Sequence, residues 1–157
     1  MLKFIILFMT LMGQLGQAKS QTTVKPFAVS ERMDGLMLGH YMETMEDPDA
    51  AVTIEAILSG SYNEQFIPSK SSQPGFGFSK SVFWARLHVI NDGEKSRRLL
   101  IENQYAQTDY LTFYDIQGES VIPVTLGDKI AYDKRVFHHR YVVFDVMVPP
   151  GETTYYF

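Results

Sequence analysis

The sequence of 157 residues contains no cysteine. This absence excludes a disulfide framework, a thiolate metal site, a cysteine nucleophile and a lipid-modified cysteine behind an export signal. A domain without cross-links must be stabilised by its hydrophobic core, and an apolar content of 45% supplies enough side chains for one core. We therefore expect a single domain with no covalent cross-link.

Basic residues are few and scattered. The formal net charge is −4 at pH 7, and no cluster of Lys and Arg is longer than the pair Arg97 and Arg98. A protein that binds nucleic acid normally presents a basic patch to the phosphate backbone. We therefore expect no nucleic-acid partner.

The motifs of catalysis and metal binding are missing as well. The sequence has four histidines, which are His40, His88, His138 and His139. They show no H-E-x-x-H or comparable ligand spacing, and no G-x-S-x-G elbow occurs. The acidic stretch 46–49 has the oxygen ligands of a Ca²⁺ site but is more typical of a solvated turn. We predict that the protein is not an enzyme and holds no cofactor or metal, while carboxylates that meet only in the folded chain stay an open alternative.

The first twenty residues are typical of an export signal. Lys3 supplies a positive charge, residues 4–12 are mainly apolar, and small and polar residues follow as far as Ser20. The apolar run is too short for a hydrocarbon core of about 30 Å, so cleavage is favoured over a retained anchor. We expect a signal peptide over residues 1–20 and an exported domain over 21–157. Export without disulfides is typical of a bacterial periplasm.

The remaining pattern predicts β-structure. Turn signals recur about every ten residues in the second half of the chain, with alternating segments between them. The predicted strands cover residues 22–29, 82–90, 97–102, 110–115, 121–125, 137–148 and 153–157. Thr53 is placed to cap a short helix through Leu58, and residues 59–79 form the longest irregular stretch. This is typical of an all-β antiparallel sandwich or barrel with one short helix. The strand TTYYF at 153–157 stops without polar slack, so we expect a truncated last strand and a longer protein.

Five segments carry a resemblance to a known family. They are YMETMEDPDAAVTIEAI (41–57), FWARLHVIND (83–92), YLTFYDIQGE (110–119), LGDKIAYDKR (126–135) and FDVMVPPGETTYYF (144–157). Over residues 24–157 the chain resembles the second type of extracellular sensor domain of bacterial seven-transmembrane receptors with diverse intracellular signalling modules. The resemblance implies a jelly-roll β-sandwich similar to carbohydrate-binding modules, held in the periplasm and tethered to the inner membrane. It also implies a histidine kinase or diguanylate cyclase output behind the membrane region. This sequence departs from the family pattern in lacking the Arg-containing segment that follows the last strand.

The predicted strand 82–90 carries the first candidate site. Alternation places Phe83, Ala85, Leu87 and Val89 on one face, and it places Trp84, Arg86 and His88 on the other. An indole stacks on a sugar ring, and a guanidinium binds a carboxylate or a hydroxyl pair. We therefore predict that Trp84, Arg86 and His88 line an open ligand platform. The alternative is structural, with Trp84 packed under the long loop and Arg86 paired with an acid across the sheet.

A second row lies on the predicted strand 137–148 and the residues before it. If that strand is regular, Val142, Phe144, Val146 and Val148 face the core, while Arg135 and His139 lie on the opposite side. Arg135 matches the arginine that follows the Gly-Asp turn of the family. We predict that Arg135 and His139 join the first row in one pocket, and we add Tyr114 because it faces away from Leu111 and Phe113. The alternative for Arg135 is surface pairing with Asp128 or Asp133.

These observations predict a periplasmic sensor domain that binds a small carbohydrate-like or anionic ligand. Contact with the membrane is expected only through a region after the last strand, and pairing with a second copy as a homodimer stays open. Two rival functions are a carbohydrate-binding module of a polysaccharide-acting protein and a structural dimerisation domain.

Overall fold

A computed structural model describes residues 24–29 and 35–157. The predicted signal peptide and the first two residues of the predicted strand 22–29 lie outside them. The strands are β1 (Phe27–Ala28), β2 (Met42–Asp47), β3 (Ile67–Pro68), β4 (Val82–Asn91), β5 (Arg97–Asn103), β6 (Leu111–Gln117), β7 (Ser120–Leu126), β8 (Val142–Val148) and β9 (Gly151–Tyr156). The helices are α1 (Ile54–Leu58) and the short 3₁₀ turns η1 (Gly39–Tyr41), η2 (Asn63–Gln65) and η3 (Tyr132–Lys134).

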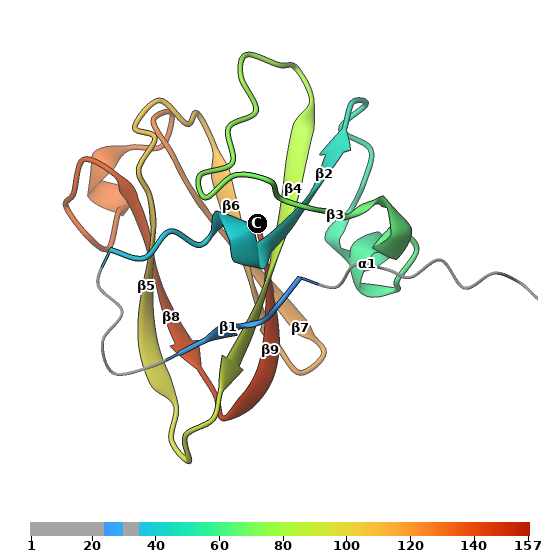
Figure 1. The fold of residues 1–157 in the computed structure, drawn as a ribbon. Coiled ribbons are helices and arrows are strands. Elements are labelled where there is room, and N and C mark those ends of the chain that lie inside the picture. The colour runs from blue at the N-terminus through green and yellow to red at the C-terminus, as the bar shows by residue number, and fades with distance from the viewer. Residues whose placement is uncertain (1–23, 30–34) are drawn as a thin grey trace, which may run out of the picture.

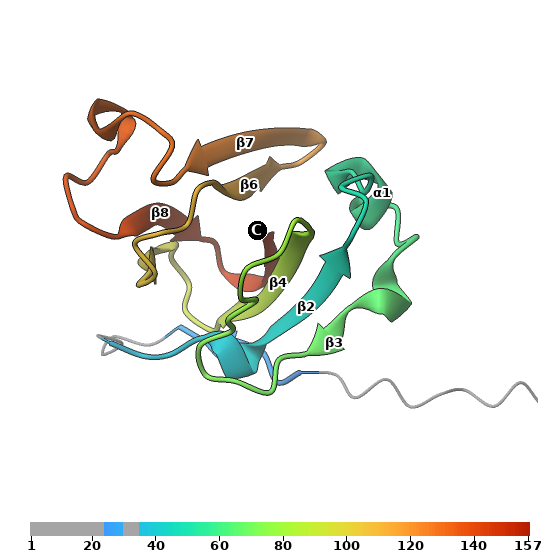
Figure 2. The same cartoon turned by 90° about the horizontal axis from the view of Figure 1, so that it is seen from above.

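Two antiparallel sheets pack on each other as a sandwich (Figures 1 and 2). The large sheet has the order β3-β2-β4-β9-β6-β7, and the small sheet consists of β5 and β8. The chain leaves the large sheet at β5, returns at β6, leaves again at β8 and returns at β9, an alternation that suits a jelly roll. The prediction of an all-β sandwich with one short helix is confirmed. β1 is the exception to antiparallel pairing, because it runs parallel to β4.

The main core lies between the two sheets. Leu87 and Val89 of β4 are fully buried there, facing the small sheet. The buried residues of β8 alternate as the sequence predicts, at Val142, Phe144, Val146 and Val148. Each such side chain contributes about 1.5–3 kcal/mol relative to an exposed one, which is the main stabilisation available to a domain without disulfides.

A second apolar cluster covers the other face of the large sheet. It contains Met45, Ile54, Ile57, Phe66 and Trp84. Ile54 and Ile57 come from α1, the helix predicted from the capping residue Thr53, whose hydroxyl accepts the N–H of Ala56 at 3.3 Å. The helix prediction is therefore confirmed. Because α1 lies beside the end of β2 (Figure 2), it covers this face where β2 and β4 are paired.

The prediction of a strand over 137–148 is wrong in its first half, because β8 begins only at Val142. Before it the chain forms η3 and then a folded loop, in which the N–H of His139 donates to the carbonyl of Phe137 at 2.8 Å. The guanidinium of Arg135 also donates to the carbonyls of Gly127 and His139, both at 3.0 Å. These bonds hold the segment in turns, so its side chains do not alternate.

Candidate ligand-binding site

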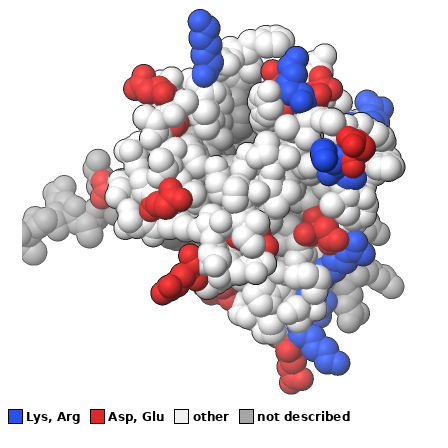
Figure 3. Space-filling view, turned by 180° about the vertical axis from the view of Figure 1, so that it is seen from behind, with Lys and Arg blue, Asp and Glu red and all other residues white. Residues whose placement is uncertain are grey.

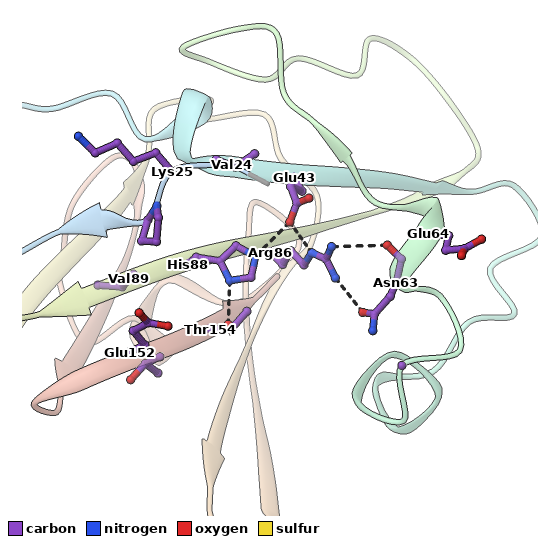
Figure 4. Close-up of a pocket in the computed structure, with 13 residues that line it drawn as sticks. Val24, Lys25, Glu43, Asn63, Glu64, Arg86, His88, Val89, Glu152 and Thr154 are labelled. Carbon is purple, nitrogen blue, oxygen red and sulfur yellow. Dashed lines mark hydrogen bonds and ion pairs between the residues drawn. The ribbon is translucent and has the colours of Figure 1, made fainter. Parts of the chain in front are cut away.

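A buried carboxylate forms the centre of the candidate site (Figure 4). Glu43 of β2 is only 6% exposed and lies directly opposite Arg86 of β4 in the sheet register. Its Oε2 accepts a hydrogen bond from Arg86 Nε at 2.6 Å. A buried ionised carboxylate is costly unless it is paired, so this contact is what keeps Glu43 stable in its position.

His88 connects Glu43 to the neighbouring strand. Its Nε2 lies 3.0 Å from Glu43 Oε2, and its Nδ1 lies 3.0 Å from the hydroxyl of Thr154, the residue paired with His88 on β9. An ionised carboxylate only accepts hydrogen bonds, so Nε2 must carry a proton. Nδ1 of a neutral ring then accepts from Thr154. The His88 side chain is 34% exposed, so part of the imidazole faces solvent.

Arg86 also binds the segment that follows α1. Its Nη1 donates to the side-chain oxygen of Asn63 at 2.9 Å, and its guanidinium carbon lies 4.4 Å from the centre of the Phe66 ring. Asn63 begins η2, so Arg86 links the sheet to the irregular stretch that covers it. The guanidinium is therefore fixed in direction by a carboxylate, an amide and an aromatic face.

These side chains lie in an open groove with a volume of about 940 Å³. Its lining residues are Val24, Lys25, Pro26, Glu43, Gly60, Asn63, Glu64, Arg86, His88, Val89, Glu152, Thr153 and Thr154. The lining contains three carboxylates, from Glu43, Glu64 and Glu152, and two permanent cations, from Lys25 and Arg86. It contains no aromatic side chain except the imidazole of His88. The groove thus presents polar donors and acceptors with a slight excess of negative charge.

Two buried carboxylates predict how stability depends on pH. Burial raises the pKa of Glu43, but the hydrogen bonds from Arg86 and His88 outweigh it and hold the pKa below its usual range. Burial likewise raises the pKa of Asp47, but hydrogen bonds from the backbone N–H groups of Val52 and Ala51, at 2.9 and 3.2 Å, outweigh it and hold this pKa below its usual range. A lowered pKa in the folded state contributes stability that is present above about pH 4.5 and is lost as the pH falls through the folded value.

We therefore expect the free energy of unfolding to fall steadily as the pH is lowered below about 4.5. Urea denaturation at a series of pH values measures this. In Glu43→Gln the acid loss should be smaller than in the wild type, because one of the two carboxylates is gone. An unfolding free energy that is constant or rises between about pH 4.5 and pH 3 would contradict the assignment of lowered pKa values.

One predicted site residue, Trp84, is enclosed and a second, Tyr114, packs against it, which corrects the predicted platform. Trp84 is 5% exposed within the second apolar cluster, and its ring stacks on Tyr114 with the ring centres 5.4 Å apart. Tyr114 is half-buried, and burial, with Glu55 as a second cause, raises the pKa of its hydroxyl. The predicted face is right, since Trp84, Arg86 and His88 share it. Yet Phe66 and α1 cover the indole, so Trp84 does not face an open surface.

Arg135 and His139 lie in the β7–β8 loop and do not line the groove. The terminal N–H groups of Arg135 donate to the carbonyls of Gly127 and His139, and not to the carboxylates of Asp128 or Asp133. His139 is exposed, and its Nδ1 accepts the N–H of Tyr141 at 3.3 Å. The predicted single pocket of Trp84, Arg86 and Arg135 is therefore wrong. Of the six predicted residues the groove brings together Arg86 and His88.

Three residues of the network were not predicted, namely Glu43, Asn63 and Thr154. The structural alternative for Arg86 anticipated an acid across the sheet, and the structure shows that acid to be Glu43. The alternation of METMED at 42–47 contains a usable signal, because Glu43, Met45 and Asp47 share the buried face of β2. An acid two residues from a buried methionine in a strand lies on the same buried face. Such a carboxylate needs a cation or a hydrogen-bond donor as its partner.

Two further properties concern residues 24–29 and 35–157. No three His, Asp or Glu side chains gather there in an arrangement that could hold a metal ion. Asp47, in the acidic stretch considered as a Ca²⁺ site, instead accepts backbone N–H groups in a turn. No helix in this part of the chain is long and apolar enough to cross a membrane.

The fold and the groove define a class of all-β sandwich domains with a polar recess on one sheet. The family model described as 7TMR-DISM extracellular 2 matches residues 39–157, from the start of η1 to the residue after β9. The chain belongs to this family, the extracellular sensor domains of membrane receptors, and the predicted resemblance is confirmed. The family implies an extracytoplasmic location. Comparison with curated proteins finds no match.

Proposed function

We propose that this extracellular domain senses a small polar ligand, which binds in the groove and contacts His88 and Thr154, while Arg86 holds the site in shape. Binding would report to an intracellular output of histidine kinase or diguanylate cyclase type, and the domain itself would catalyse no reaction. The proposal rests mainly on one observation: the buried Glu43 holds both Arg86 and His88 in place, while the imidazole of His88 stays 34% exposed in the groove. Fixed polar groups at a solvent-open recess are what a specific binding site needs.

The charge of the groove favours a hydroxylated neutral ligand over an anionic one. An anion would meet the carboxylates of Glu64 and Glu152, whereas Arg86 is already occupied by Glu43 and Asn63. Hydroxyl groups both donate and accept, so they suit this mixed lining. Stacking of a sugar ring on Trp84 is not part of the proposal, because the indole is buried.

A thermal-shift screen with neutral oligosaccharides and organic acids tests the proposal. At a ligand concentration of 100 Kd the folded state gains about 2.7 kcal/mol, which raises the melting temperature by several degrees. We expect such a shift with a neutral saccharide in the wild type and its loss in His88→Ala. The matched control is His139→Ala, which removes a histidine outside the groove and should keep the full shift.

Two outcomes would contradict the proposal: a shift that persists in His88→Ala, or a melting temperature that no member of the panel changes. In the second case sedimentation distinguishes the dimerisation rival, which requires a stable dimer in the absence of ligand. A detached carbohydrate-binding module would instead bind a polysaccharide without any signalling region in the same protein.

A further inference from the structure

A loop with an unusual composition rises above one end of the sandwich. Residues 69–81, here called the aromatic-basic loop, connect β3 to β4; they pass beside η1 and then rise to the upper end of the molecule in Figure 1. Phe78 in this loop is fully exposed, at 104% of its reference area, and Phe76 is 42% exposed. Aromatic side chains at a loop tip leave apolar area in contact with water, which is unfavourable. Such an exposed apolar patch can mark a surface that a partner covers.

The loop also stands out by charge. The protein is acidic overall, with a net charge of −4, yet no Asp or Glu occurs anywhere from Gln65 to Asn91. The loop itself carries Lys70 and Lys80. Glu46 approaches only its base, where the carboxylate accepts the hydroxyl of Ser81 at 2.7 Å. Viewed from behind, a basic side chain projects at the upper end, acidic side chains lie below it on the left, and both charges occur on the right (Figure 3).

The loop is anchored at its base and free at its tip. The ring of Phe76 stacks on Phe83 of β4, with ring centres 4.2 Å apart and planes 9° from parallel. Gly77 beside Phe78 has φ +65°, and a Cβ built there would meet no atom within 4 Å. The glycine therefore lets the chain turn at the tip while the anchored ring keeps the loop raised.

Neighbouring segments contact the first half of the loop. The side-chain nitrogen of Gln73 lies 3.2 Å from the sulfur of Met37 and 3.3 Å from the side-chain oxygen of Gln104. Met37 is exposed, and so is Tyr105, which follows Gln104. The first half of the loop is thus held against two other parts of the chain, at Met37 and Gln104.

We propose that the tip of the aromatic-basic loop docks onto an anionic lipid surface, with Phe78 inserted at the acyl boundary and Lys80 against the headgroup phosphates. Lys70 takes no part, because it lies at the other end of β2, where the N–H of Ser69 donates to Met42. A phenylalanine at the tip with a lysine two residues away is a combination that suits a bilayer interface. No acid occurs from 65 to 91, so the projecting tip itself carries only the positive charge of Lys80, while the acidic turn that ends β2 lies beside the base of the loop. An extracellular domain of a membrane receptor works within reach of lipid headgroups.

Co-sedimentation with vesicles tests the proposal. The probes are vesicles of equal parts phosphatidylglycerol and phosphatidylcholine, and vesicles of phosphatidylcholine alone. We expect the whole chain to bind the anionic vesicles. Phe78→Ser should bind them at least about tenfold more weakly. Lys80→Glu should also bind more weakly, by a factor of up to about five. The N-terminal residues are the same in every variant, so their own contribution cancels in these ratios.

Two matched controls lie outside the loop: Met147→Ser, an exposed apolar residue on β8, and Lys95→Glu, in the turn between β4 and β5. Both should bind vesicles like the wild type, and melting curves should show that every variant folds. Equal partitioning of the wild type and Phe78→Ser would overturn the proposal, and so would equal binding to both vesicle types. Self-association that depends on Phe78 without vesicle binding would overturn it in favour of a second copy. The groove is tested separately, because Phe78→Ser should keep the ligand-induced thermal shift.

Discussion

Replacing Trp84 with alanine is expected to lower the free energy of unfolding by about 3–5 kcal/mol. The indole is almost completely buried between α1, Phe66 and the ring of Tyr114, so truncation leaves a cavity that a helix of five residues cannot fill. Urea denaturation followed by circular dichroism measures the change. The wild type offers a second signal, because Trp84 is the one tryptophan of the sequence. Its emission should be blue-shifted in the folded state and move to longer wavelength on unfolding.

Tyr110→Ala serves as the matched control, because it truncates an exposed aromatic residue before β6 and should change stability little. If Trp84→Ala unfolds at the same urea concentration as the wild type, the indole is not part of a packed cluster. In that case Trp84 would be free to stack on a ligand, as the sequence alone suggested.

Replacing Arg86 with alanine is expected to cost a similar amount, about 3–5 kcal/mol. The reason differs from that for Trp84, since the change leaves the buried carboxylate of Glu43 with His88 as its remaining side-chain partner. Most of the loss should be recovered in the double variant Glu43→Gln and Arg86→Met, which removes the charge together with its counter-ion. A double-mutant cycle of Glu43→Gln, Arg86→Met and their combination, measured by urea denaturation, isolates the coupling between the two side chains.

The exposed pair of Arg98 and Asp145 is the natural comparison for this cycle. It has similar distances, 2.8 and 2.9 Å, but both side chains are open to solvent. Arg98→Ala should therefore have little effect on stability. If Arg86→Ala proves as harmless as Arg98→Ala, Glu43 is not held in the network that the groove requires.

The parts of the fold that the sequence predicted are those set by local pattern. The period of two fixed the buried face of β8, and Thr53 marked the start of α1 because a hydroxyl at that position accepts a free N–H. The same period put Trp84, Arg86 and His88 on one face of β4. The period carries no information about what covers that face. The cover over Trp84 is formed by α1 and Phe66, which lie more than fifteen positions earlier in the chain.

The candidate site was predicted less completely, because it depends on strand register and on loop conformation. Glu43 meets Arg86 through the pairing of β2 with β4, across 43 positions that a single sequence does not align. Arg135 was placed on a strand, but its guanidinium finds backbone carbonyls in a folded loop. Hydrogen bonds of a side chain to the main chain override a periodic pattern in this way when the segment is not held in a sheet.

The groove and the β7–β8 loop, which the sequence predicted to form one site, are distinguished most directly by nuclear magnetic resonance of the histidine side chains. The ligand from the thermal-shift screen is titrated into the protein while the imidazole ¹⁵N signals of His88, His138 and His139 are followed. We expect the signals of His88 to move with the ligand, while those of His138 and His139 in the β7–β8 loop stay in place. Movement of His139 with His88 unchanged would contradict this expectation and would place recognition at the loop instead of the groove.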